Sequence, residues 1–129
     1  MAGFARLMVV CSDLERSKKF YRTILDLEVV TDASPLWAEL ALGDGTSLAL
    51  YPANDMLPVR RGSVQMGFIV ADVDAFVIDA RTAGVEVLQE PYDERSARIA
   101  VIADPDGYPI QVATPAAEES PYERRSRRR

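Results

Sequence analysis

The feature that most constrains this chain is a repeated order of elements, because each half predicts a short strand, a helix and then three strands. Asp13 and Asp72 stand at the start of the two predicted helices, 59 positions apart (72 − 13). Leu48 and Ile110 lie in the two closing strands, 62 positions apart (110 − 48). A repeat of this kind is typical of duplicated modules packed around a shared surface. We therefore predict an α+β fold made of two tandem βαβββ modules.

In the first half, an apolar run is followed at once by a helix-start signal. Ser12 and Glu15 match the S-x-x-E capping box, in which the two side chains satisfy backbone N–H groups of the first turn. Asp32 to Pro35 favours a break in the chain. The predicted elements are a strand at 5–11, a helix ending near 25, and strands at 28–31, 37–42 and 46–51.

The second half restarts after a connector at 52–62 that shows neither helical nor strand periodicity. Asp72 can cap its helix, and Gly84 falls at the expected stop. The segment A-D-P-D-G-Y predicts a tight turn, because Pro105 presets φ and Gly107 relieves the last position. The predicted strands are 64–70, 85–88, 95–103 and 108–114.

The length of 129 residues predicts one domain over 1–114, with modules at about 4–52 and 63–114 and a flexible, arginine-rich tail at 115–129. The net charge of −5 leaves an acidic body, which argues against a nucleic-acid partner. No apolar run approaches the roughly 20 residues that cross a bilayer, so no membrane partner and a cytoplasmic location are expected. Cys11, the single cysteine, is predicted to be a buried core residue.

Three segments carry a resemblance to a known family. V-x-x-S-D-L-E-R-S-x-x-F-Y at 9–21, D-V-D-A-F at 72–76 and D-P-D-G-Y-P-I-Q-V at 104–112 occur in order and at matching spacing. Together they resemble the glyoxalase / bleomycin-resistance / extradiol-dioxygenase (vicinal oxygen chelate) superfamily. The resemblance covers about residues 5–114 and implies curved mixed sheets around a cleft. It also implies a homodimer.

In metal-using members of that family, His, Glu or Gln ligands come from the first and last strands of each module. The matching positions here are Arg6, Ala49, Gln65 and Gln111. Arginine is a permanent cation, alanine has no donor, and the chain has no histidine. Glu39 is the nearest carboxylate, and one acid does not make a cage. We therefore expect no metal and no other cofactor.

Strand alternation predicts which side chains line the cleft. If Leu40 and Leu48 pack beneath the helix, the side chains that alternate with them along the strands face the cleft. The candidate ligand-binding residues are Arg6, Met8, Trp37, Glu39, Ala49, Tyr51, Gln65, Gly67 and Gln111. Their mixture of apolar area with a few polar points suits a small-molecule pocket. The facing of the strand at 95–103 is left open.

Several of these candidates have a purely structural interpretation. Trp37 could fill a dimer interface, and Arg6 could pair with Glu39 to neutralise the cleft. Gln65 and Gln111 could hydrogen-bond each other as a structural seam. Tyr51 could be a rim residue.

Three functions remain open on this basis. The first is a metal-free protein that sequesters a small-molecule ligand, either an antibiotic or an aromatic metabolite. The second is a metal-independent isomerase or cyclase, in which Glu39 or Tyr51 acts as acid or base and Arg6 holds an oxyanion. The third is a metal-dependent lyase or dioxygenase, which the four matched positions disfavour. No catalytic residue is assigned.

Overall fold

Two four-stranded sheets, each with its own helix, make up the part of the chain that the computed structural model describes, residues 1–62 and 64–115. The chain divides into unit 1, Met1–Arg61, and unit 2, which begins at Gly62. That boundary falls at the end of the predicted connector. The predicted tail lies outside the described residues except for Pro115, the last residue of the closing strand.

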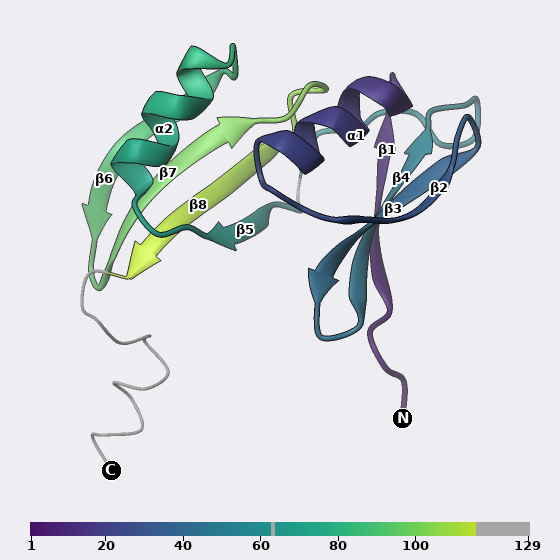
Figure 1. Ribbon diagram of the computed structural model, residues 1–129, viewed down its shortest axis with the longest axis horizontal. Helices are drawn as coiled ribbons and strands as arrows, with labels where there is room; N and C mark the ends of the chain where they lie inside the picture. Colours follow the sequence, from purple (N-terminus) through teal and green to yellow (C-terminus); the bar gives the residue numbers. More distant parts are fainter. Residues whose placement is uncertain (63, 116–129) are drawn as a thin grey trace. The chain divides into compact units, whose positions relative to one another are not determined.

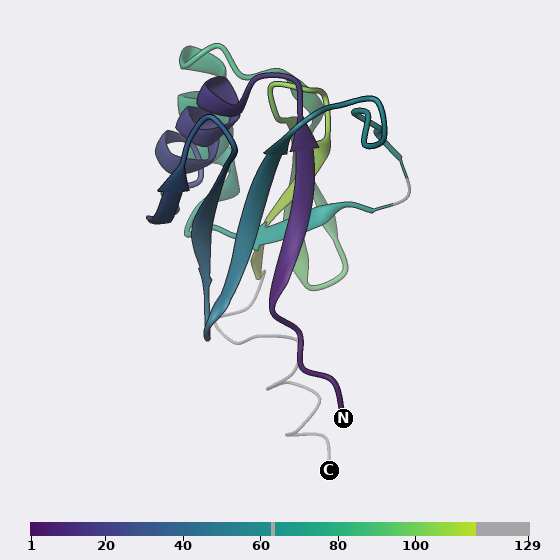
Figure 2. The same cartoon turned by 90° about the vertical axis from the view of Figure 1, so that its right-hand side faces the viewer.

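Unit 1 contains β1 (Arg6–Cys11), α1 (Leu14–Thr23), β2 (Val29–Ala33), β3 (Trp37–Gly43) and β4 (Thr46–Pro52). The strand order is β1-β4-β3-β2. Figure 2 shows these strands side by side, with β1 in purple. β1 runs parallel to β4, and the other pairs are antiparallel. The helix between β1 and β2 therefore serves as part of the crossover that a parallel pair requires.

Unit 2 repeats this arrangement with β5 (Met66–Ile69), α2 (Val73–Thr82), β6 (Val87–Glu94), β7 (Ala97–Ala103) and β8 (Pro109–Pro115). Its order is β5-β8-β7-β6, with β5 parallel to β8. Figure 1 shows α2 lying along the sheet, over β6 and β7. The predicted fold class, two tandem βαβββ modules with mixed sheets, is confirmed.

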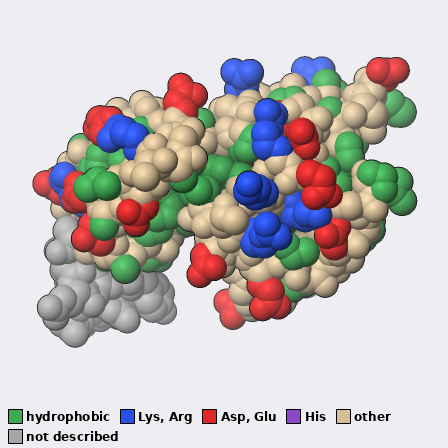
Figure 3. Space-filling view, turned by 45° about the horizontal axis from the view of Figure 1, so that its top comes forward, with side chains coloured by type: hydrophobic (Ala, Val, Ile, Leu, Met, Phe, Trp, Pro, Cys, Tyr) green, Lys and Arg blue, Asp and Glu red, His purple; other side chains and the backbone are tan. Residues whose placement is uncertain are grey.

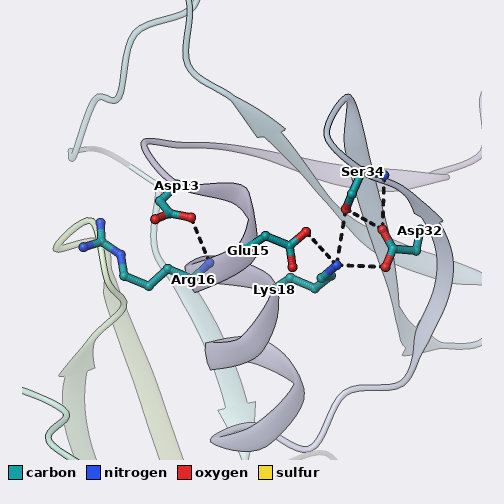
Figure 4. Close-up of polar contacts among 6 residues, drawn as sticks. All are labelled: Asp13, Glu15, Arg16, Lys18, Asp32 and Ser34. Atoms are coloured by element: carbon teal, nitrogen blue, oxygen red, sulfur yellow. Dashed lines mark hydrogen bonds and ion pairs between the residues drawn. The ribbon is translucent and has the colours of Figure 1, made fainter.

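The helix starts follow one rule in both units. An aspartate in extended conformation caps each helix: Asp13 accepts a hydrogen bond from the Arg16 N–H (3.0 Å), and Asp72 accepts one from the Ala75 N–H (3.1 Å). The predicted capping box with Ser12 as the cap is wrong. The Ser12 hydroxyl accepts a hydrogen bond from the Arg16 guanidinium. The Glu15 carboxylate accepts one from Lys18 instead of reaching back to the start of the helix (Figure 4).

Each unit builds its core between the helix and one face of its sheet. In unit 1 the largest fully buried side chains include Tyr21, Leu40, Leu48 and Leu50, and in unit 2 they include Val73, Ile102, Ile110 and Val112. Each such side chain contributes about 1.5–3 kcal/mol through its removal from water. Cys11 is fully buried, as predicted, and its thiol donates to the Tyr51 carbonyl.

Two strands run at least two residues further than the sequence predicted. β2 continues through Ala33, because Asp32 and Ala33 still pair with β3 and the turn begins only at Ser34. β6 continues to Glu94, with register shifts between Val87 and Tyr92. Such bulges let a strand accommodate a proline that cannot donate to the ladder, here Pro91.

A buried lysine ties α1 to β2. Lys18 is only 8% exposed, and its ammonium donates to Asp32 (2.8 Å), Glu15 (3.0 Å) and Ser34 (3.2 Å). Figure 4 shows the three acceptors converging on this nitrogen. The hydrogen bonds to Asp32 and Glu15 raise the pKa of Lys18. Those from Lys18 and Ser34 lower the pKa of Asp32 to about 2.

The described surface carries charges of both signs. Figure 3 shows acidic and basic side chains interspersed on the face it presents, so this face has no extended basic patch of the kind that binds nucleic acid. Within residues 1–62 and 64–115, no helix has the length and apolar character to cross a bilayer.

Candidate functional site

The strand ladders of unit 1 sort its side chains onto two faces, because residues paired across neighbouring strands point to the same side. Leu40 and Leu48 pair with each other on the face that contacts α1. The opposite face, which we call the open face of unit 1, has no helix of its own unit over it. It carries Arg6, Met8, Trp37, Glu39, Ser47, Ala49 and Tyr51. The strand pairing therefore puts these side chains on the same face as the alternation of the sequence predicted.

Two aromatic rings stack at one end of the open face of unit 1. Trp37 on β3 and Tyr51 on β4 lie almost parallel, with an interplanar angle of 10° and centroids 6.0 Å apart. They meet because Ala38 pairs with Leu50, which brings the next residues, Trp37 on β3 and Tyr51 on β4, opposite each other. Both side chains are partly exposed. The pair therefore presents aromatic surface on which a further ring can stack.

A polar cluster occupies the other end of this face. The Glu39 carboxylate accepts a hydrogen bond from the Ser47 hydroxyl, and its Oε2 lies 3.6 Å from Arg6 Nε. The Arg6–Glu39 ion pair, which the sequence left open as a structural alternative, is thus present. The Glu39 side chain is 16% exposed, whereas the Arg6 side chain is 51% exposed. The buried partner is the anion, and the partner facing outward is the cation.

Met8 and Ala49 lie between the two ends. They pair across β1 and β4, and Ala49 also pairs with Glu39. Met8 is 49% exposed, while Ala49 is fully buried and so can serve only as the floor of this face. Sequence alternation placed Ser47 on this face too but did not single it out, because its role depends on the side chain of Glu39.

The open face of unit 2 carries a different set of side chains. Gly67 pairs with Gln111, and a Cβ added at Gly67 would lie 3.5 Å from the Gln111 side-chain oxygen. Gln65 precedes β5, so the ladder sets Gly67 and not Gln65 beside Gln111. The facing of β7, left open by the sequence, is decided by pairing: Val101 lies beside Gln111, and Ile99 beside Ala113.

The four positions matched to metal ligands carry a guanidinium, a methyl group and two amides. This donor set does not fit a divalent cation, which prefers carboxylate, imidazole or thiolate ligands. Arg6 is already engaged by the nearest acid, Glu39. The described residues also contain no group of three His, Cys, Asp or Glu side chains placed to hold a metal ion.

Two βαβββ units, each with a helix on one sheet face, define a class of duplicated α+β proteins. The family model described as "Glyoxalase/Bleomycin resistance protein/Dioxygenase superfamily" matches residues 3–112. The chain therefore belongs to this superfamily, as the resemblance of its three motifs indicated.

A relative from Mycolicibacterium smegmatis, described only as an uncharacterised protein, is 32% identical over 110 residues, covering 84% of this chain and 91% of the relative. TnmS3, an antibiotic binding protein from Streptomyces sp. CB03234, has a similar structure with a TM-score of 0.73 and 28% identity, covering 89% of this chain and 97% of that one. Lactoylglutathione lyase from Agrobacterium tumefaciens gives a TM-score of 0.68 at 20% identity, covering 88% and 94%. This last likeness concerns the fold alone.

Proposed function

We propose that this protein is a metal-independent small-molecule-binding protein that sequesters a planar aromatic compound, an antibiotic or an aromatic metabolite. The observation that supports it most directly is the parallel Trp37–Tyr51 pair on the open face of unit 1. Aromatic surface beside a few polar groups is the usual composition of a small-molecule site. The similarity to an antibiotic-binding protein is in keeping with this proposal.

The binding residues proposed are those of the two open faces. In unit 1 they are Arg6, Met8, Trp37, Glu39, Ala49 and Tyr51, and in unit 2 they are Gln65, Gly67 and Gln111. On unit 1, Trp37 and Tyr51 supply stacking area and the guanidinium of Arg6 supplies a polar contact. On unit 2, the amide of Gln111 supplies a polar contact. Ala49 contributes space, because a larger side chain there would fill the floor between Met8 and Glu39.

A titration of neutral tricyclic aromatics, such as anthraquinone-2-carboxamide, tests the proposal. Trp37 is the single tryptophan of the chain, so its fluorescence reports directly on this face. Calorimetry then compares Trp37→Ala with Gln111→Ala. We expect Trp37→Ala to weaken binding roughly tenfold or more, because an indole face provides stacking beyond area burial. Gln111→Ala should cost less, since water can replace part of one neutral hydrogen bond.

The ligand is expected to be recovered unchanged, which separates sequestration from an isomerase or cyclase. Each variant must first give the parent's unfolding transition. Parent-like binding by Trp37→Ala, together with a hundredfold loss in Gln111→Ala, would mean that recognition is polar and centred on unit 2. If the parent converts the ligand and Glu39→Gln abolishes the conversion, the metal-independent isomerase or cyclase becomes the better hypothesis.

A further inference from the structure

We propose that the ligand of this face is a polycyclic aromatic acid, whose rings stack on the Trp37–Tyr51 pair and whose anionic group is bound by Arg6. The inference rests on the proposed function and adds to it the chemical class of the ligand. It follows from the position, exposure and charge of three groups on one face: the aromatic pair, Glu39 and Arg6.

The sign of the ligand's charge follows from which member of the ion pair is accessible. Glu39 is mostly buried, and its Oε2 is occupied by the Ser47 hydroxyl and by Arg6. Arg6 Nε lies 3.6 Å from Glu39 Oε2, which is beyond hydrogen-bond distance, and half of the Arg6 side chain is exposed. Glu39 is its one ion-pair partner among residues 1–62 and 64–115. An incoming group therefore meets the outer edge of a guanidinium, which presents paired N–H donors suited to a carboxylate.

The size of the ligand follows from strand geometry. Arg6 pairs with Ser47, four residues before Tyr51 on β4. At about 3.3 Å per residue, the Cα atoms of Ser47 and Tyr51 are separated by roughly 13 Å along β4. A single-ring acid spans less of this distance than a fused multi-ring acid does. A fused multi-ring acid can lie across Met8 with its rings on Trp37 and its carboxylate at Arg6.

The test compares two probes that differ only in charge, anthraquinone-2-carboxylic acid and anthraquinone-2-carboxamide, by calorimetry and Trp37 fluorescence. We expect the parent to bind the acid about tenfold more tightly than the amide, because charge-assisted hydrogen bonds are stronger than neutral ones. This preference should shrink in high salt, since the guanidinium is half-exposed. Benzoic acid, which lacks the span, should bind at least about tenfold more weakly than the tricyclic acid.

Two matched substitutions should act in opposite directions. Arg6→Gln removes the positive charge and should abolish the preference for the acid, so that the acid and the amide bind with similar affinities. Glu39→Gln removes the opposing negative charge, keeps an oxygen acceptor for Ser47, and should strengthen acid binding several-fold. A merely structural role for the Arg6–Glu39 pair would lower the affinity for both probes in both variants.

The outcomes separate this inference from the function on which it rests. Equal affinity for acid and amide in the parent, or an acid preference that survives Arg6→Gln, would overturn the inference and leave aromatic binding intact. Failure of both probes to bind would overturn the proposed function, and the inference with it. An acid preference lost in Arg6→Gln and increased in Glu39→Gln would support both.

Discussion

At the scale of single residues, two buried polar side chains show opposite ways of meeting the cost of burial. Ser17 faces the core from α1 and is fully buried, and its hydroxyl has no hydrogen-bond partner in the described structure. Asp104 is 4% exposed, and its Oδ1 accepts from the backbone N–H groups of Asp106 and Tyr108, both at 2.9 Å. The Ser17 hydroxyl therefore destabilises the fold, whereas the Asp104 carboxylate stabilises a turn.

We expect Ser17→Ala to stabilise the protein by about 1 kcal/mol. The substitution removes an unpaired buried hydroxyl and introduces the best helix former. The measurement is the free energy of unfolding from urea denaturation, provided that its dependence on urea concentration, the m-value, is the same in parent and variant. A loss of stability instead would indicate that the hydroxyl is satisfied by a buried water.

We expect Asp104→Ala to destabilise the protein by about 2 kcal/mol. Two backbone N–H groups of the D-P-D-G turn would lose their acceptor, and each unpaired buried donor is costly. Asp104→Asn is the matched control, because it keeps the oxygen acceptor and should cost clearly less. Equal effects of the two substitutions on urea unfolding would show that the carboxylate acts through its charge.

At the scale of elements, the connection between α1 and β2 depends on protonation. Lys18 on α1 donates to Asp32 on β2, and this bond is the main reason why the pKa of Asp32 falls from 3.8 to about 2. A carboxylate whose pKa is lowered by folding stabilises the folded state above its unfolded pKa. That contribution is lost as the pH falls from about 4 through 2.

We therefore expect Asp32→Asn to lower the stability of the fold near pH 6. The loss of stability should become smaller as the pH is lowered. The observable is the difference in urea midpoint between parent and variant, which should shrink as the pH drops below about 4. Asp55→Asn, at an exposed acid outside the Lys18 cluster, is the control and should show no such trend. A difference between parent and Asp32→Asn that stays constant down to pH 2 would contradict the coupling.

At the scale of the whole molecule, duplication has kept the topology and changed the chemistry. The strand order is the same in both units. Yet the open face of unit 1 carries the aromatic pair and the ion pair, whereas that of unit 2 carries Gly67, Val101 and Gln111. The chain thus uses one scaffold twice and gives the two open faces different side chains.

We expect a symmetric homodimer in solution. Within the described residues, β1 and β2 end the first sheet and β5 and β6 end the second, and such edges are normally covered. Light scattering coupled to gel filtration should give twice the chain mass of 14.2 kDa. A species of the single-chain mass at micromolar concentration would contradict this expectation.

Local sequence signals determined most of the fold. The helix starts at Asp13 and Asp72, the stop at Gly84 and the turn before β8 all depend on residues within a few positions of one another, so no tertiary information was needed. Alternation also assigned the faces of β1, β3 and β4, because their two parities differ in polarity. The Arg6–Glu39 contact was foreseeable from that parity.

The remaining features were decided only by tertiary pairing. Apart from Arg98, the run from Ala97 to Ala103 is apolar on both parities, so only its ladder with β8 shows that Val101 lies beside Gln111. The length of β6 depends on bulges that β7 imposes. Lysine side chains are mostly exposed, but three acceptors brought from α1 and from the end of β2 allow the burial of Lys18. A side chain's environment is set by partners distant in sequence, and periodicity carries no information about which partners those are.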